Sequence, residues 1–371
     1  MTPRRCMTAW IILVMAWVSP LYALSTTVEP SIHTERLWRL AELEERTLEQ
    51  RGVVLHDATM EHSLQTVVMR LWEQVSTDLT APVVEVAMET RTDAVTYPNG
   101  VILLTTGMLE QIKNQDQLAI ILAHELIHYA RQHTIQLYDH LQVSAQTNGL
   151  PSVDHSPTIS ETDVAQQVNA AEYQADSEGL VIFKAAGYCE AEILPLISTM
   201  IDQMQAQGAS KALDDLVARK IRMQAMISQD PMTGTCASAA DSGQKFFLDC
   251  IAPALMANAQ TAIRQGDWGL ADRCITKYVT MKSDDARAYY LQGEIMRLRD
   301  DVDHEDQSMG YYEAALKIDP QFPPVHRALG ELYFKAGQYQ QAKPYFETFL
   351  SIAPEDESRM YVEGYLRQCQ N

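Results

Sequence analysis

Hydrophobic positions in the first part of the chain recur mostly at helical spacing. Residues 31–50 carry leucines every three to five positions among charged residues, and residues 61–76 continue the pattern with leucine and valine. This spacing predicts two amphipathic helices. Residues 83–90 instead alternate apolar and polar, which predicts a half-buried strand. A second short strand, a Pro-Asn-Gly turn at 98–100 and a third strand at 101–104 follow.

The pattern then predicts a short helix at 108–113 and a long helix from about Asp116, its expected N-cap, to about Thr134. The long helix is apolar on more than one face, which is typical of a helix buried on all sides. Residues 142–162 are rich in Ser, Thr, Asn and Pro. This stretch is long for a loop, so it is either a mobile lid over a site or a disordered insertion.

Three more helices are predicted at 163–186, 190–207 and 211–228, and Gly187 is a natural residue to follow the end of the first. Residues 229–245 then change to small, polar and turn-forming residues. We expect a domain boundary in this stretch, between one domain at 24–240 and another at 246–371.

The second of these domains is repetitive. Gly337, Ala342, Phe346 and Pro354 lie at the offsets of a 34-residue helix-turn-helix repeat, and earlier copies align around Gly293 and Ala259. Small residues let paired helices approach closely, and aromatic residues fill the gaps between stacked pairs. These three units resemble tetratricopeptide repeats, which usually present a groove that binds peptides or partner proteins. The alternative is that the repeats only stabilise the fold or a dimer.

Composition and charge narrow the class of protein. The chain has 371 residues, enough for two or three domains, and its net charge of −20 argues against a nucleic-acid partner. Two arginines at 4–5, an apolar run at 9–18 and a small-residue cleavage site near Ala23 are the layout of a signal peptide at 1–23. No later segment is long and apolar enough to span a membrane. We therefore expect an exported, periplasmic protein.

The cysteines are less decisive. Without Cys6, five cysteines remain, and in an oxidising compartment one or two disulfides are plausible. Cys236 and Cys250 are the easiest pair because they flank one short loop-like stretch. Spacing alone does not establish the connectivity.

The most specific chemical signal is His124-Glu-Leu-Ile-His128 in the predicted long helix. Residues four apart lie on the same helix face, so both imidazoles would meet one point. A catalytic zinc ion takes three protein ligands and keeps one position open. Glu125, turned away by one residue, would act as the general base on water. The alternative is a pair of partly buried helix histidines that carbonyl groups satisfy.

A third ligand has to come from elsewhere. The metzincin arrangement is excluded, because Arg131 and Thr134 stand where it needs glycine and histidine. Glu172, 44 residues after His128, supplies a carboxylate from a later helix, and Asp176 follows one turn on. Asp176 would accept the free N–H of a ligating histidine and fix its tautomer. An acidic helix face without this task is the alternative.

Together, HELIH, the later Glu-x-x-Ala-Asp and the closing Gly187-Tyr188 resemble the HtpX-like and CAAX-prenyl-protease-like zinc metallopeptidases. The resemblance, over about 58–228, implies an α+β, mainly helical zincin-type domain holding one Zn²⁺. With an all-α tetratricopeptide solenoid after it, the chain is similar to the BepA-like exported peptidases of outer-membrane biogenesis. The resemblance also implies that the edge of residues 102–109 pairs with an extended substrate backbone.

The chain departs from the family near residues 210–220. It retains an arginine, Arg219, but it lacks the family's His-Pro segment and has no match for the histidine that regulates the metal in such relatives. No residue for stabilising an oxyanion is assigned from the sequence. Tyr188, His155 and Arg219 are the weak candidates.

The sequence thus predicts an exported zinc endopeptidase that hydrolyses misfolded or unassembled envelope proteins. His124, His128 and Glu172 would hold the metal, Glu125 would be the catalytic base, and Asp176 would support a ligand. The repeats would recruit protein substrates or outer-membrane assembly machinery. The alternative is a non-catalytic chaperone or assembly scaffold with a structural zinc, in which Glu125 would have no task.

Overall fold

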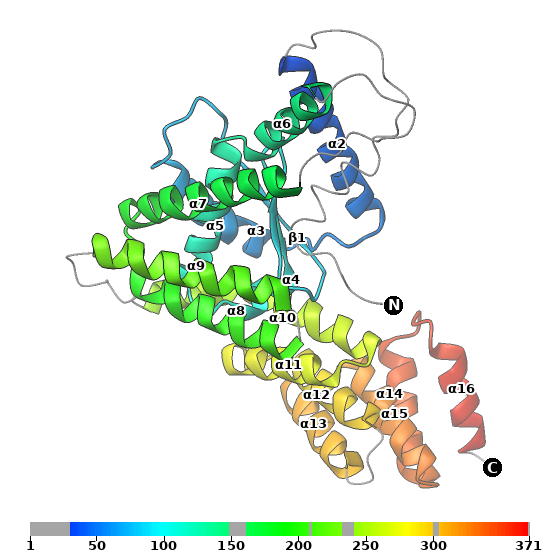
Figure 1. The fold of residues 1–371 in the computed structure, drawn as a ribbon. Helices are drawn as coiled ribbons and strands as arrows, with labels where there is room; N and C mark the ends of the chain where they lie inside the picture. Colours follow the sequence, from blue (N-terminus) through cyan, green and yellow to red (C-terminus); the bar gives the residue numbers. More distant parts are fainter. Residues whose placement is uncertain (1–29, 148–160, 208–209, 232–240, 300–303, 370–371) are drawn as a thin grey trace. The chain divides into compact units, whose positions relative to one another are not determined.

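The computed structural model describes residues 30–147, 161–207, 210–231, 241–299 and 304–369 (Figure 1). The predicted signal peptide and most of the polar stretch at 142–162 lie outside these residues. The chain divides into two compact units, residues 1–254 and 255–371. Helix α10 (Asp241–Gln265) runs through this division, which falls later than the predicted boundary at 229–245.

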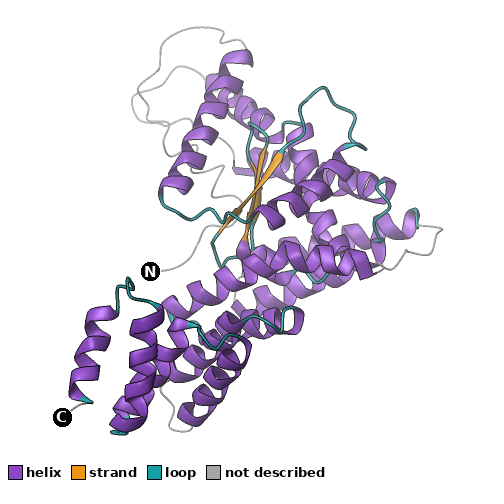
Figure 2. Cartoon of the chain, turned by 180° about the vertical axis from the view of Figure 1, so that it is seen from behind, coloured by secondary structure: helices purple, strands orange, loops and turns teal. Residues whose placement is uncertain are grey.

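The first unit combines a small sheet with many helices, as Figure 2 shows. Its elements before α10 are α2 (Pro30–Gln50), α3 (Ala58–Trp72), β1 (Val83–Ala87), β2 (Ala94–Thr96), β3 (Val101–Thr105), α4 (Thr106–Gln111), α5 (Gln115–Ala130), α6 (His133–Thr147), α7 (Glu161–Ala185), the short 3-10 helix η1 (Glu190–Glu192), α8 (Ile193–Gln207) and α9 (Ser210–Gln229). The mainly helical α+β class expected from the sequence is confirmed.

The three strands have the order β1-β3-β2. Strand β1 pairs in parallel with β3, and β2 pairs antiparallel to β3, with Thr96 opposite Ile102. The expectation that residues 102–109 offer an exposed edge is therefore wrong, because β3 is hydrogen-bonded on both sides and residues from Thr106 onward are helical. The short strand β2 lies at the edge instead.

Helix α5 differs at both ends from the prediction. Asn114, not Asp116, is the N-cap, and its Oδ1 accepts from the backbone N–H of Gln117 at 2.9 Å. The Asp116 carboxylate instead accepts from the N–H of Cys189, also at 2.9 Å. The helix ends at Ala130 rather than near Thr134, because Gln132 takes a left-handed conformation with φ of 54° and starts a new direction.

Helices α5 and α7 pack directly against each other. Small residues on α7 make the approach possible: Ala175 is fully buried, and a Cβ at Gly179 would lie 3.3 Å from the backbone nitrogen of His124. The close approach therefore sets the distance between side chains that the two helices direct toward each other.

The second unit is all α, as the repeats predicted. After α10 its helices are α11 (Trp268–Met281), α12 (Ala286–Leu298), α13 (His304–Ile318), α14 (Pro323–Lys335), α15 (Tyr339–Ile352) and α16 (Arg359–Gln368). A Cβ on Gly330 of α14 would lie 2.5 Å from the Phe346 ring of α15, and Gly293 faces Tyr312 in the same way. The repeated glycines therefore mark the points where paired helices are closest.

The cysteine pairing suggested by the sequence is wrong. Cys250 is a free thiol, fully buried in the interior of α10 rather than beside a loop. Cys369 is also a free thiol, whereas Cys189 is disulfide-bonded. Across the described residues, no helix combines the length and apolar character needed to cross a membrane.

Candidate metal centre

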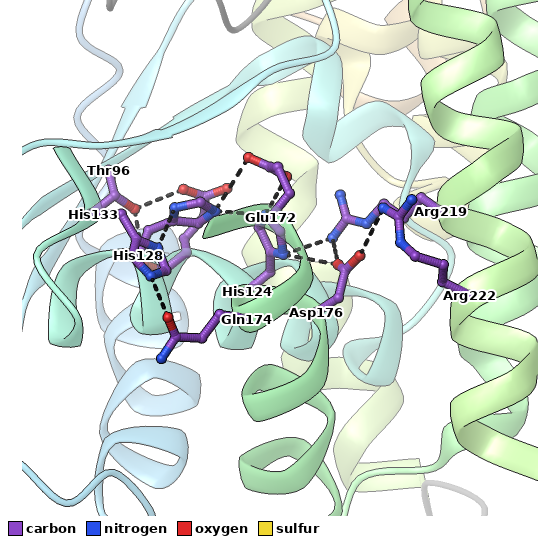
Figure 3. Close-up of polar contacts among 10 residues, drawn as sticks. Thr96, His124, His128, His133, Glu172, Gln174, Asp176, Arg219 and Arg222 are labelled. Atoms are coloured by element: carbon purple, nitrogen blue, oxygen red, sulfur yellow. Dashed lines mark hydrogen bonds and ion pairs between the residues drawn. The ribbon is translucent and has the colours of Figure 1, made fainter. Parts of the chain in front are cut away.

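Three potential metal ligands converge between α5 and α7 (Figure 3). His124 and His128 lie one turn apart on α5 with their Nε2 atoms 3.0 Å apart. Glu172 on α7 places its carboxylate oxygens 3.4 Å from Nε2 of His124 and 3.6 Å from Nε2 of His128. The ligand atoms of all three residues lie within 4.8 Å of one another. The structure thus brings together the two imidazoles and the carboxylate that the sequence selected.

The other nitrogen of His124 faces a carboxylate. Its Nδ1 lies 3.1 Å from Oδ1 of Asp176, whose side chain is fully buried one turn after Glu172 on α7. Arg219 of α9 lies 2.7 Å from the same Oδ1 and 2.8 Å from Nδ1, and Arg222 lies 3.7 Å from Oδ2. The two guanidinium groups balance the charge of Asp176, and the guanidinium of Arg219, which can only donate, also points at Nδ1 of His124.

The other nitrogen of His128 faces a third histidine. Nδ1 of His128 lies 3.1 Å from Nδ1 of His133, at the start of α6. Nε2 of His133 lies 3.1 Å from Oε1 of Gln174, and the amide nitrogen of Gln174 donates to Glu178 at 2.7 Å. Glu178 also pairs with Arg131 at 2.7 Å.

Glu125 lies beside the cluster and is only 5% exposed. The hydroxyl of Thr96, on the edge strand β2, lies 2.7 Å from Oε2 of Glu125 and 3.0 Å from its carbonyl oxygen. Burial raises the pKa of the Glu125 carboxyl, while His124 and the Thr96 hydrogen bond act in the opposite direction. A carboxylate held in this way is suited to accept a proton.

The surrounding protein shifts the pKa values of the two imidazoles in opposite directions. Burial and Arg219 lower the pKa of His124, but its contacts with Asp176 and Glu172 outweigh them and raise the pKa to about 9. Burial and the neighbouring His124 lower the pKa of His128 to about 3. Burial opposes ionisation of Glu172, yet the hydrogen bond and charge of His124 hold the pKa of its carboxyl below the usual range.

These residues fit a zinc ion. Two imidazoles and one carboxylate are a ligand set that catalytic zinc sites use. Both histidines can direct Nε2 at a shared point, since each Nδ1 has a partner on its far side. Without a bound cation, hydrogen-bond acceptors would lie close together in a mostly buried space. These acceptors are the carboxylates of Glu172 and Asp176 and the nitrogen lone pairs of the two imidazoles.

The structure also distinguishes among the weaker candidates for stabilising an oxyanion. Arg219 contacts Asp176 and His124, so it supports the ligand shell rather than an open position of the site. The Tyr188 ring stacks on Phe183, and the guanidinium of Arg70 lies 4.5 Å from the centre of the ring, so these two side chains are the neighbours that hold it. His155 lies outside the described residues.

Four supporting residues were not identified from the sequence: Thr96, His133, Gln174 and Arg222. Only His133 carried a usable signal, as a histidine one residue short of the position that metzincins use. Its role depends on a turn that no spacing rule indicated.

Comparisons with known proteins find two family matches in the chain. Residues 58–242 match peptidase family M48, and residues 306–361 match the tetratricopeptide repeat. No curated protein matches the chain significantly. A solved structure titled MamA AMB-1 C2221 is similar at 15% identity, covering 50% of this chain and 92% of that one, with a TM-score of 0.24. A similarity at that level carries no argument about this fold.

Proposed function

This chain carries a peptidase family M48 domain followed by tetratricopeptide repeats, and we propose that it is a zinc-dependent endopeptidase of the cell envelope. Family M48 implies a metallopeptidase. The observation that supports the specific proposal is the meeting of His124, His128 and Glu172 within 4.8 Å, with Glu125 buried beside them.

A bound zinc ion would supply Lewis-acid polarisation of the scissile carbonyl and would make water more acidic. The chain's own residues supply proton transfer. Glu125 accepts a proton from the attacking water and later delivers it to the leaving amine. Thr96 holds one oxygen of that carboxylate at 2.7 Å, so the other oxygen is oriented for the proton.

Substrate binding is proposed along strand β2. It is an edge strand next to the site, and its Thr96 contacts Glu125 directly. An extended substrate segment that pairs with such an edge is held by main-chain hydrogen bonds, which read little of the side-chain sequence. This suits an enzyme that acts on misfolded or unassembled proteins.

Sequence patterns in the N-terminal segment and in the repeats support the proposed location and partners. The N-terminal pattern of arginines, apolar run and small residues supports export to the periplasm. The repeats support recruitment of protein substrates or of outer-membrane assembly machinery, because such arrays usually bind peptides and proteins.

A second candidate is a chaperone or assembly scaffold whose zinc is structural. The tetratricopeptide match favours it, since that part of the chain can act without catalysis. Glu125 opposes it, because a structural site has no use for a buried carboxylate next to an open coordination position.

The variant Glu125→Gln separates the two. We expect it to bind one zinc per chain and to cleave unfolded casein at least about 100-fold more slowly than wild type, since general-base catalysis contributes ~10²–10⁴-fold. Glu73→Gln, an exposed glutamate after α3, is the control and should cleave normally. Zinc is measured by atomic absorption and cleavage by release of labelled peptides. A zinc-loaded Glu125→Gln variant that cleaves at the wild-type rate rules out the peptidase and leaves the scaffold.

A further inference from the structure

We propose that His133 is a positioning residue for the metal centre. Its imidazole accepts a hydrogen bond from Nδ1 of His128, and this bond keeps the Nε2 lone pair of His128 directed at the metal. The inference rests on the proposed function, because it assigns a task within the same site. His133 would not touch the metal or the substrate.

The backbone brings His133 to this place through one unusual turn. Gln132 has a φ of 54° and, among the described residues, no other residue except glycine has a positive φ. Left-handed backbone is unfavourable for a residue with a Cβ, and it persists where the surrounding structure requires it. Here it ends α5 after Ala130 and lets His133 fold back toward His128, five residues earlier. A direct continuation of α5 would carry His133 around the helix axis instead.

A chain of hydrogen bonds then fixes the direction of every proton. Arg131 can only donate and an ionised Glu178 can only accept, so their 2.7 Å pair sets one end. The amide nitrogen of Gln174 must face Glu178, at 2.7 Å, which turns Oε1 of Gln174 toward His133. Nε2 of His133 therefore carries the hydrogen, and its Nδ1 has a free lone pair.

The same logic continues to the metal ligand. Nδ1 of His133 accepts from Nδ1–H of His128 at 3.1 Å, so Nε2 of His128 keeps the lone pair that a metal requires. The surroundings of His124 differ, because its Nδ1 lies 3.1 Å from the carboxylate of Asp176 and 2.8 Å from the guanidinium of Arg219. The two histidines thus have different supports, the Asp176–Arg219 pair for His124 and the imidazole of His133 for His128.

Burial and ring geometry match this task. His133 is 6% exposed, and its ring stands nearly perpendicular to that of His128, with an interplanar angle of 82° and centroids 4.9 Å apart. An edge-on arrangement places nitrogen against nitrogen rather than face against face. A histidine that served only to fill space would not need both of its nitrogens in line with polar partners.

The test is the zinc affinity of full-length variants, measured by competition with a chromophoric chelator. His133→Asn keeps an acceptor at the δ position that faces His128, His133→Gln moves it to the ε position that faces Gln174, and His133→Ala removes both. His140→Ala is the matched control, a histidine seven residues later on the same helix α6. Circular dichroism and thermal unfolding of the zinc-free proteins identify any variant that fails to fold.

We expect His133→Ala and His133→Gln to bind zinc about 10–100-fold more weakly, as loss of a ligand's hydrogen-bond partner usually does. His133→Asn should bind at least about fivefold more tightly than His133→Ala, and His140→Ala should equal wild type. The visible spectrum of the cobalt-substituted protein should change in His133→Ala and not in His140→Ala. This order cannot arise from general loosening of α6, because asparagine and glutamine would then be equally harmful.

The inference is overturned if His133→Ala binds zinc within twofold of wild type, or if His133→Asn is no better than His133→Ala. If His133→Ala does not fold, the comparison of His133→Asn with His133→Gln decides. Failure of the metal site itself is distinguishable, since wild type and His124→Ala would then bind zinc equally poorly.

Discussion

Glu172 is the proposed metal ligand on α7, whereas the two histidines of the cluster lie on α5. Its carboxylate lies 3.4 and 3.6 Å from the two Nε2 atoms and completes the cluster from a different helix. Changing it to alanine leaves two imidazoles, which are too few for a stable catalytic zinc site. We predict that purified Glu172→Ala retains well under half of the wild-type zinc, expected at about one per chain, as measured by atomic absorption after dialysis.

Asp163→Ala is the control for this variant, because it removes an exposed carboxylate from the same helix. It should keep its zinc. Equal zinc content in Glu172→Ala and wild type would show that the carboxylate is not a ligand and would contradict the proposed site.

At the scale of single residues, the sequence predicts which side chains lie together where those residues share one helix. His124, Glu125 and His128 need only the 3.6-residue period to be placed together. Glu172 required the further assumption that a second helix packs on the first, which Ala175 and Gly179 make possible. The support from Thr96 and Arg219 was beyond such reasoning, since these residues lie 29 and 95 positions from the side chains they contact.

Helix pairs in the second unit depend on glycines at their points of contact. A Cβ on Gly330 would lie 2.5 Å from the Phe346 ring, which is fully buried and has no room to withdraw. We predict that Gly330→Ala destabilises the second unit by about 1–3 kcal/mol, because overpacking a core forces side chains and backbone to shift. The measurement is urea unfolding of the full chain, followed by circular dichroism.

Gly310 provides the matched control on α13. It also lies within a helix, but it is exposed and a Cβ there meets nothing within 4 Å. Gly310→Ala should therefore be neutral or stabilise the unit by up to about 1 kcal/mol, since alanine favours helix. If both substitutions have the same effect, the close contact at Gly330 is not what the repeat requires.

At the scale of helices and strands, the local hydrophobic pattern predicts the type of an element better than its ends or its neighbours. Helix and strand type were predicted correctly for β1, β3, α7 and the repeats, because their hydrophobic periods are long or regular. The end of α5 was missed because Gln132 adopts a left-handed conformation that glycine or asparagine normally signals. The central place of β3 was missed because strand order depends on pairing between distant segments, which one strand's sequence does not encode.

For the whole molecule, the domain order was predictable and the disulfide was not. Composition changes near residue 240, and the 34-residue repeat begins after it, so two units followed from the sequence. Cys250 looked available for a disulfide only because α10 was not predicted to begin at Asp241. Once the helix covers that position, its thiol is fully buried and free.

The two units should respond separately to metal. Zinc that binds only the folded first unit stabilises it by about 4 kcal/mol at a free concentration of ~1,000 times the dissociation constant. For a unit of this size we predict a rise of roughly 8–16 °C in its thermal transition after zinc is added to the chelator-treated protein. The transition of residues 255–371, which contain none of the three ligands, should stay within about 1 °C by differential scanning calorimetry of the full chain. Gly330→Ala assigns the transitions, because it should lower only the second. If zinc moved both transitions together, the chain would unfold as one cooperative block, and its division into two compact units would not describe its energetics.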